Sequence, residues 1–461
     1  MYLADSRGTP AVVPHRGRRW AAVPGTVLAL GAVSLITDVS AEMVTAVLPL
    51  YLVSALGLSP LGFGVLDGVY NGVGALVRLA GGHLADGGGG RHKAVAVAGY
   101  GLSALCKPLL LVAHTLPVIG AVLALDRTGK GLRTAPRDAL ISLATPPERR
   151  GRAFGVHRAM DTTGALCGPI LAFLVLGVAA EGYDAVFTVS SCVAVLGVVV
   201  LVLFVPARPA TAAADTAAAD TAAANAATAD TAAANAAAGS AATSGPLRVT
   251  ALLRMPGVRR LAACAVLLGL TTVSDSFVYL LLQRRFAVPA QWFPLLPLGT
   301  AAAFLLLAVP LGVVADRIGR RRLFLLGHLA LLAAYGVVLA VPGGPLPVVA
   351  VSVVAVLVLH GAFYAATDGV LAAAVAGLVP DAMRARGLAL VGTGQALARF
   401  ACSIAFGAAW TAWGDGPALA VATAALAIST PVAIAALRPS TGPSAGSPTG
   451  PAGTPSRQRA T

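Results

Sequence analysis

Charged side chains gather in one short stretch of an otherwise apolar chain, DRTGKGLRTAPRDAL at 126–140, which holds six charges in fifteen positions. On an α-helix, Asp126, Lys130, Arg133 and Arg137 fall within about 60° of one another. Burying such groups in hydrocarbon costs several kcal/mol, so the helix must face a wet cavity or find partners on neighbouring helices. The chemistry open to it is binding of a charged solute, exchange of protons, or permanent ion pairing.

Carboxylates in other apolar segments are the expected partners. Asp38 and Glu42 share one helix face, and burial favours the neutral form of a carboxyl whereas a basic neighbour favours the charged form. A cavity that opens first to one side and then to the other can therefore load and release a proton. The proton-coupling candidates are Asp38, Glu42, Asp161 and Asp275, with Arg127 as a switching partner or anion clamp. The substrate or cavity candidates are Arg127, Lys107, Asp67, Asn71, Arg78, Lys130, Arg158, Gln395 and Arg399.

A purely structural interpretation stays open for several of these groups. One end of the predicted helix carries Arg133, Arg137 and Asp138, which favours permanent ion pairing between helices or a conformational gate. Lys107 and Arg399 are isolated basic groups in apolar helices, and Arg399 contacts substrate or, equally, is a packing charge satisfied by Asp275. His360 is expected to be a satisfied core residue rather than a ligand. Asp38, Glu42, Arg127 and Asp275 lie near the centres of their predicted helices, which favours function.

The elements that position these groups are membrane-spanning helices. The chain has 461 residues, of which 57% are hydrophobic and 11% charged, against about 25% charged in soluble domains. We therefore predict an all-α membrane protein. Runs of about 20 apolar residues give twelve spans, near 27–53, 61–84, 94–113, 117–140, 153–178, 184–205, 261–283, 292–315, 323–341, 346–370, 387–410 and 417–437.

The net charge of +14 follows the predicted topology. With the amino terminus in the cytoplasm, 23 of the 33 Lys and Arg residues fall in inside segments, as the positive-inside rule requires. Nucleic acid is therefore not an expected partner. We predict a multi-pass protein of the cell (inner, cytoplasmic) membrane with both termini cytoplasmic.

An Ala-rich repeat near 210–245 has no large apolar side chain and cannot build a core. The two parts that it separates carry similar segments, since Asp38 and Asp275 are 237 residues apart and Asp86 and Asp316 are 230 apart. This indicates a duplicated six-helix unit. The predicted divisions are 1–24, an N-terminal bundle 25–205, a cytoplasmic linker 206–256, a C-terminal bundle 257–437 and a disordered tail 438–461.

The segment GVVADRIGRR at 312–321 resembles the GxxxDRxGRR loop of major facilitator superfamily transporters, and GHLADGGGGR at 82–91 is a partial first copy in which Gly87 and Gly90 replace basic residues. LITDVSAEM and DRTGKGLRTAPRDALI resemble a prokaryotic subgroup with mostly unassigned substrates. The resemblance implies two pseudo-symmetric six-helix bundles that rock about a central cavity. It also implies a conformational gate, for which the candidates are Asp86, Gly82, Gly89, Arg133, Arg137, Asp138, Gly312, Asp316, Arg317, Gly319, Arg320 and Arg321.

These features predict a secondary active transporter of a small organic solute. Since TGKG lacks the rest of a phosphate-binding loop and buried carboxylates are available, protons are the expected driving ion. GALCGP at 164–169 resembles part of the helix 5 motif of drug antiporters, which favours efflux of a drug or metabolite. The alternatives are proton-coupled uptake of an organic anion and a non-transporting membrane receptor. No enzymatic activity, cofactor or metal site is expected, and the predicted state is a monomer.

Overall fold

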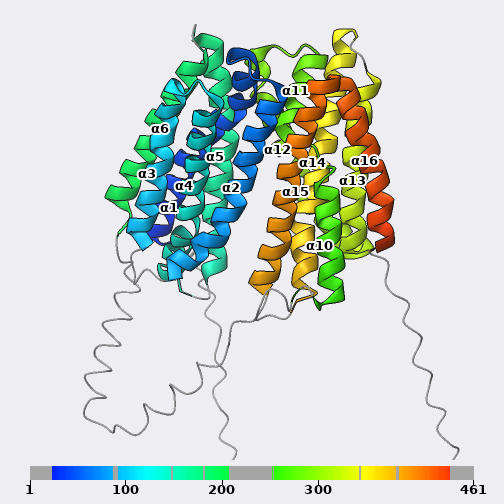
Figure 1. The fold of residues 1–461 in the computed structure, drawn as a ribbon. Helices are drawn as coiled ribbons and strands as arrows, with labels where there is room; N and C mark the ends of the chain where they lie inside the picture. The colour runs from blue at the N-terminus through cyan, green and yellow to red at the C-terminus, as the bar shows by residue number, and fades with distance from the viewer. Residues whose placement is uncertain are drawn as a thin grey trace, which may run out of the picture.

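The computed structural model describes residues 23–86, 92–146, 149–179, 182–206, 252, 254–341, 344–379 and 384–436. The regular elements in these ranges are helices (Figure 1). Most of the predicted linker, the tail and Gly89 lie outside the described residues. The side chains of Arg78, Asp86 and Arg320 are likewise not described.

The helices form two bundles that lie side by side in Figure 1, one from each part of the chain. The first bundle contains α1 (Gly25–Leu50), α2 (Pro60–Asp86), α3 (His92–Val112), α4 (Leu116–Leu143), α5 (Arg150–Val178) and α6 (Gly182–Phe204), with a short π-helical turn η1 (Tyr51–Ala55) after α1. The second contains α10 (Pro256–Gly269), α11 (Asp275–Arg285), η3 (Ala290–Trp292), α12 (Leu295–Ile318), α13 (Arg320–Ala340), α14 (Leu346–Ala376), α15 (Arg384–Trp413) and α16 (Asp415–Ala436).

Packing within each bundle follows a similar plan. In the first, α1 packs against α5 and α6, and α4 packs against α2 and α3. In the second, α14 packs against α12 and α13, and α15 against α10 and α16.

Eight helical stretches in the described chain are long and apolar enough to cross a membrane. α2, α4 and α15 are not among them, although α2 has 27 residues and thus a length of about 40 Å. Their polar positions interrupt the apolar run, and these are the helices that carry Asp67, Asp126 and Arg399. Length with low hydropathy is typical of a span that lines a polar interior. The chain is a multi-pass membrane protein.

The predicted span at 261–283 is not one helix, so this prediction was wrong. α10 ends at Gly269 and α11 begins at Asp275, with a non-helical turn between them. The intervening TTVS sequence is rich in β-branched and hydroxyl residues, which are weak helix formers. The backbone N–H of Val273 donates to the Tyr335 hydroxyl at 2.9 Å, which satisfies a buried donor that the break leaves free.

Among the described residues, the two bundles approach each other most closely near one end. We call the end that holds Gly25 and Ala436 the terminal face and the other end the opposite face. Near the opposite face, the first half of α2 packs on the second half of α15, and the N–H of Leu61 donates to Thr411 at 3.0 Å. Toward the terminal face the bundles diverge (Figure 1).

Candidate functional site

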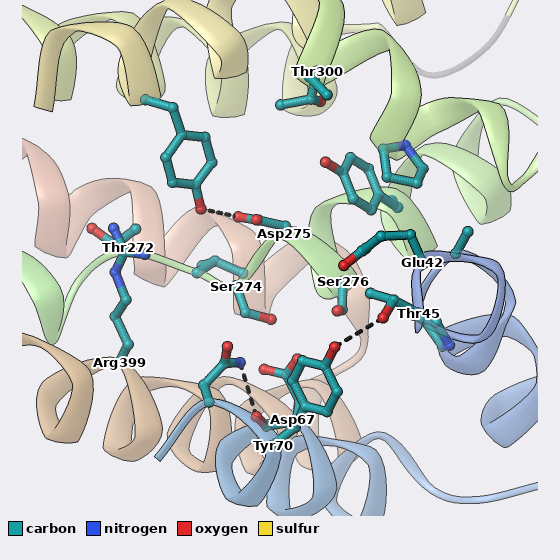
Figure 2. A pocket seen from close by; sticks show the side chains of 18 of the residues that line it. Glu42, Thr45, Asp67, Tyr70, Thr272, Ser274, Asp275, Ser276, Thr300 and Arg399 are labelled. Carbon is teal, nitrogen blue, oxygen red and sulfur yellow. Dashed lines mark hydrogen bonds between the residues drawn. The ribbon is translucent and has the colours of Figure 1, made fainter. Parts of the chain in front are cut away.

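A cavity of about 420 Å³ lies between the bundles and receives side chains from both (Figure 2). We call it the central cavity. Its walls combine carboxyl, hydroxyl and aromatic groups, which suits a polar organic molecule. The polar and aromatic side chains on its walls are Glu42, Thr45, Asp67, Tyr70, Asn71, Thr272, Ser274, Asp275, Ser276, Tyr279, Phe293, Thr300, Phe304, Tyr364 and Arg399.

Asp67 connects the cavity to the contact between the bundles. Its side chain is buried, and its Oδ2 accepts a hydrogen bond of 2.7 Å from the Ser403 hydroxyl on α15. One turn further along α2, the Asn71 amide donates to the Asp67 carbonyl at 2.9 Å. Asp67 therefore joins the two halves as well as lining the cavity.

Asp275 occupies the first position of α11, not the centre of a helix as predicted. An anion is favoured there because the first N–H groups of a helix point toward it. The Nε2 atom of His360 lies 3.1 Å from its Oδ1, and the Tyr364 hydroxyl donates to the same oxygen. The guanidinium of Arg399 lies 5.8 Å from the centroid of the Tyr364 ring. Asp275 thus lies in a polar cluster that includes Arg399, with 41% of its side chain exposed.

The helix break that places Asp275 depends on Tyr335. We expect Tyr335→Phe to cost about 1–3 kcal/mol, because the buried N–H of Val273 loses its acceptor. The midpoint of thermal unfolding of the purified protein in detergent measures this loss. The matched control is Tyr183→Phe on α6, since the Tyr183 ring is only partly buried. Equal midpoints for the two variants would show that Tyr335 does not stabilise the break.

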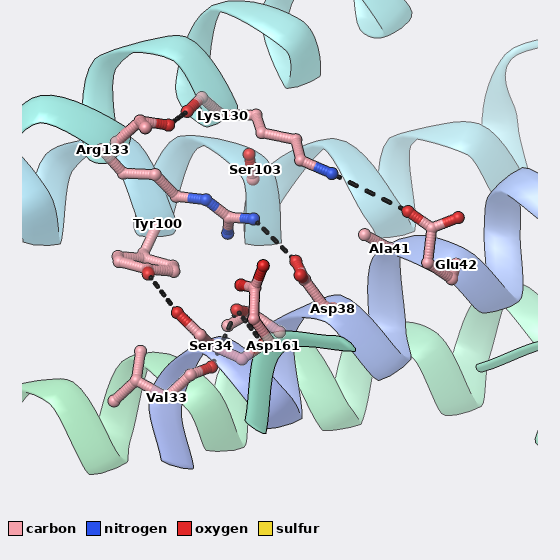
Figure 3. Close-up of polar contacts among 12 residues, drawn as sticks. Val33, Ser34, Asp38, Ala41, Glu42, Tyr100, Ser103, Lys130, Arg133 and Asp161 are labelled. Atoms are coloured by element: carbon pink, nitrogen blue, oxygen red, sulfur yellow. Dashed lines mark hydrogen bonds and ion pairs between the residues drawn. The ribbon is translucent and has the colours of Figure 1, made fainter. Parts of the chain in front are cut away.

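A second cavity, of about 340 Å³, lies within the N-terminal bundle. We call it the basic cavity. Asp38 is buried there and its Oδ1 lies 3.3 Å from Arg133 Nη2, while the Arg133 guanidinium stacks 4.3 Å from the centroid of Tyr100 (Figure 3). Glu42, one turn along α1, lies 3.7 Å from the Nζ of Lys130. The two strongest proton-coupling candidates therefore pair with α4 at neighbouring turns.

Arg127, predicted to be a switching partner or an anion clamp, is paired with Asp126 in this conformation. The Arg127 Nη2 lies 2.7 Å from one Asp126 oxygen and the Lys107 Nζ lies 3.1 Å from the other. The Arg127 guanidinium also lies over the Tyr70 ring, 3.9 Å from its centroid. Lys107, predicted to be isolated, is thus one of three buried charges in a compact cluster.

Arg137 forms the outermost part of this network. Its Nε lies 3.0 Å from Asp138 and its Nη1 lies 3.6 Å from Asp161 on α5. Arg158 is exposed and lines the basic cavity one turn before Asp161. The ion pairs of Arg133 and Arg137 lie within the N-terminal bundle, so in this conformation neither pair joins the two halves.

The described gate residues of the second motif lie at the terminal face. Gly312 and Asp316 are on the last turns of α12, and Asp316 and Arg317 are exposed. Gly319 separates α12 from α13 with φ 93°, a conformation that favours glycine. Arg321 is exposed at the start of α13. Gly82 falls on the part of α2 whose surroundings are not described.

Several residues of the site were not predicted from the sequence. Tyr70, Tyr364 and Ser403 contact charged groups, yet each lies in an apolar run where an isolated hydroxyl gives no signal. His360 was expected to be a satisfied core residue, and it is buried with its Nε2 toward Asp275. Gln395 lies on α15 one turn before Arg399, and its backbone approaches Gly269 at the end of α10.

Sequence and structure comparisons agree with this architecture. The profile described as Major Facilitator Superfamily matches residues 30–306 and 276–459. An uncharacterized MFS-type transporter of Methanocaldococcus jannaschii is 25% identical over 383 residues, which is 83% of this chain and 87% of that protein. An uncharacterized protein of Mycobacterium bovis is 36% identical over 157 residues, 34% of this chain and 38% of the relative.

Solved structures share the fold at low identity. The nucleoside transporter NupG has a TM-score of 0.71 at 13% identity, covering 90% of this chain and 99% of its own. A POT family transporter in complex with 5-aminolevulinic acid has a TM-score of 0.66 at 14% identity, covering 89% and 96%. The profile match extends over most of both bundles. This chain is therefore a membrane transporter of the Major Facilitator Superfamily.

Proposed function

We propose that the protein is a secondary active transporter that moves a small organic solute by alternating access, driven by protons. The observation that carries this proposal is a polar cavity shared by two bundles whose described residues pack most closely near the opposite face. Rocking the bundles about such a seam would open the cavity to each side in turn. The protein needs no covalent chemistry for this, and we expect it to work as a monomer.

Carboxyl groups on the cavity wall support proton coupling. The side chains of Glu42 and Asp275 are 27% and 41% exposed, so water in the cavity reaches them. Each also has a polar partner in this conformation, Lys130 for Glu42 and the His360–Tyr364 pair for Asp275. Rocking of the bundles would expose each carboxyl to water from alternate sides, so that it would take up a proton on one side and release it on the other.

We place the terminal face in the cytoplasm, because the basic loops lie at that end. The protein then lies in the cell membrane with both termini inside, and the conformation described above opens inward. Export of a metabolite or drug is our preferred direction, on the strength of the GALCGP motif. The five basic side chains of the basic cavity favour uptake of an organic anion as the second candidate.

The proposal is tested in proteoliposomes that are loaded with a cytosolic extract and then given an imposed pH gradient. Mass spectrometry of the retained solutes should reveal a compound whose distribution follows the gradient. We expect Glu42→Gln or Asp275→Asn to abolish gradient-driven accumulation, because a neutral amide cannot carry the proton. The matched control is Asp184→Asn, which changes an exposed carboxyl at the start of α6.

The results separate the alternatives. Redistribution that persists without a pH gradient would exclude proton coupling. Normal accumulation in both variants would exclude Glu42 and Asp275 as coupling groups. If folded protein, inserted in either orientation, never changes the composition of the extract inside the liposomes, the result would favour a receptor over a transporter.

A further inference from the structure

The two cavities carry opposite charge. The central cavity has three carboxyl groups, those of Glu42, Asp67 and Asp275, and one guanidinium, that of Arg399. The basic cavity has five basic side chains and two acidic ones. The basic side chains are Arg127, Lys130, Arg133, Arg137 and Arg158, and the acidic ones are Asp38 and Asp161.

The cavities also adjoin. Tyr70 and Asn71 line both of them. The ion pair of Glu42 and Lys130 runs from one to the other, because Glu42 lines the central cavity and Lys130 the basic cavity. Figure 3 shows this pair reaching across from α1 to α4. A single small molecule can therefore contact both walls.

The ion pair between the cavities is loose. The Nζ of Lys130 lies 3.7 Å from the carboxylate of Glu42, and the two side chains are 36% and 27% exposed. In the buried pair of Arg127 and Asp126, by contrast, the charged atoms are 2.7 Å apart and the side chains are 10% and 7% exposed. A long and hydrated pair contributes little stability, so opening it costs little. In addition, the Nε of Arg127 on the wall of the basic cavity is buried without a hydrogen-bond partner in the described part of the chain, and a buried donor of this kind favours an added acceptor.

We propose that the solute is a small molecule with an oxyanion at one end and a protonated amine at the other, and that it inserts between Glu42 and Lys130. Its oxyanion, a carboxylate or a phosphate monoester, replaces Glu42 as the partner of Lys130. Its amine replaces Lys130 as the partner of Glu42. Both protein charges stay paired when such a ligand binds, whereas a ligand with one charge leaves one of them without a partner.

The overall balance of charge favours the same class. Together the two cavities have six basic and five acidic side chains. A ligand with no net charge but separated charges preserves this balance, and it follows the polarity of the walls. The inference rests on the proposed function for its physiological meaning, because it names the substrate class of that transporter.

Binding to the purified full-length protein tests the inference without any gradient. The probes are 6-aminohexanoate, hexanoate and hexylamine, with 6-aminohexyl phosphate to distinguish a carboxylate from a phosphate. The midpoint of thermal unfolding is titrated with each probe. We expect 6-aminohexanoate or the aminohexyl phosphate to bind at least about tenfold more tightly than hexanoate and hexylamine, which corresponds to about 1.4 kcal/mol.

Two variants identify the ends of the site. With Lys130→Gln, the affinity for 6-aminohexanoate should fall to that of hexylamine, because only the amine end retains its partner. With Glu42→Gln, it should fall to that of hexanoate. Arg150→Gln removes an exposed guanidinium on α5 outside both cavities and should leave all affinities unchanged.

Equal affinities for all four probes in the wild-type protein would overturn the inference, as would an absence of binding by folded protein. An equal loss of affinity for all probes in both variants would also overturn it, because that result would show that the pair of Glu42 and Lys130 only stabilises the fold. Selective binding without proton-driven accumulation in the liposome assay would instead uphold the inference and reject the coupling. The binding assay therefore tests the ligand class, and the liposome assay tests proton coupling, independently of each other.

Discussion

Gly64→Val is expected to hold the bundles apart at the opposite face and to shift the protein toward a conformation that opens there. A Cβ atom on Gly64 would meet the backbone carbonyl of Ser403, and one on Gly407 would meet the carbonyl of Pro60. Here two helix backbones touch, so no side-chain rotation can relieve the clash. Overpacking of about 3 kcal/mol would change the ratio of the two conformations by about 100-fold.

Accessibility of the central cavity measures this shift. Ser276→Cys places a thiol on the cavity wall, in a background without the five native cysteines. A membrane-impermeant maleimide applied from the side of the opposite face should label it faster in the Gly64→Val variant. The matched control is Gly336→Val on α13, where an added Cβ meets no atom within 4 Å. Labelling at the wild-type rate would show that the glycine contact does not close this face.

The sequence predicts the fold because the strongest physical signals are local. Apolar runs specify spans, and helical periodicity places Asp126, Arg127 and Arg133 away from lipid, where the structure shows them buried. The break before Asp275 was missed because the sequence stays apolar or small through it. The backbone N–H that the break leaves free finds its acceptor in the Tyr335 hydroxyl, 62 residues away.

The interaction partner of a charged residue is harder to predict from the sequence than the face of the helix on which that residue lies. Periodicity shows which side of its own helix a residue occupies, but it does not specify which helix lies opposite. The sequence of α3 therefore leaves Lys107 without a visible partner, although Asp126 lies beside it across the α3–α4 contact. The bond from Ser403 to Asp67 spans 336 residues and joins the two halves, so only the packed bundles reveal it.

The buried cluster of Lys107, Asp126 and Arg127 gives the largest expected loss of stability. Asp126 is 5% exposed, and each of its oxygens contacts a different buried cation. Asp126→Asn would leave both cations without a counter-charge, at a cost of about 3–5 kcal/mol. We expect the midpoint of thermal unfolding in detergent to fall accordingly. Lys107→Met added to this variant should recover part of the loss, because it removes one of the two uncompensated charges.

Asp415→Asn is the matched control, since it breaks an ion pair with Arg285 whose side chains are 25% and 19% exposed. Because water reaches that pair, its loss should cost about 0–1 kcal/mol. A clear difference between the two aspartate variants would mark the Asp126 cluster as the part of the charged network that holds α3 and α4 together. If Asp126→Asn instead unfolds at the wild-type midpoint, the cluster is not needed for stability, and its charges would have to be assigned to the transport cycle alongside Glu42 and Lys130.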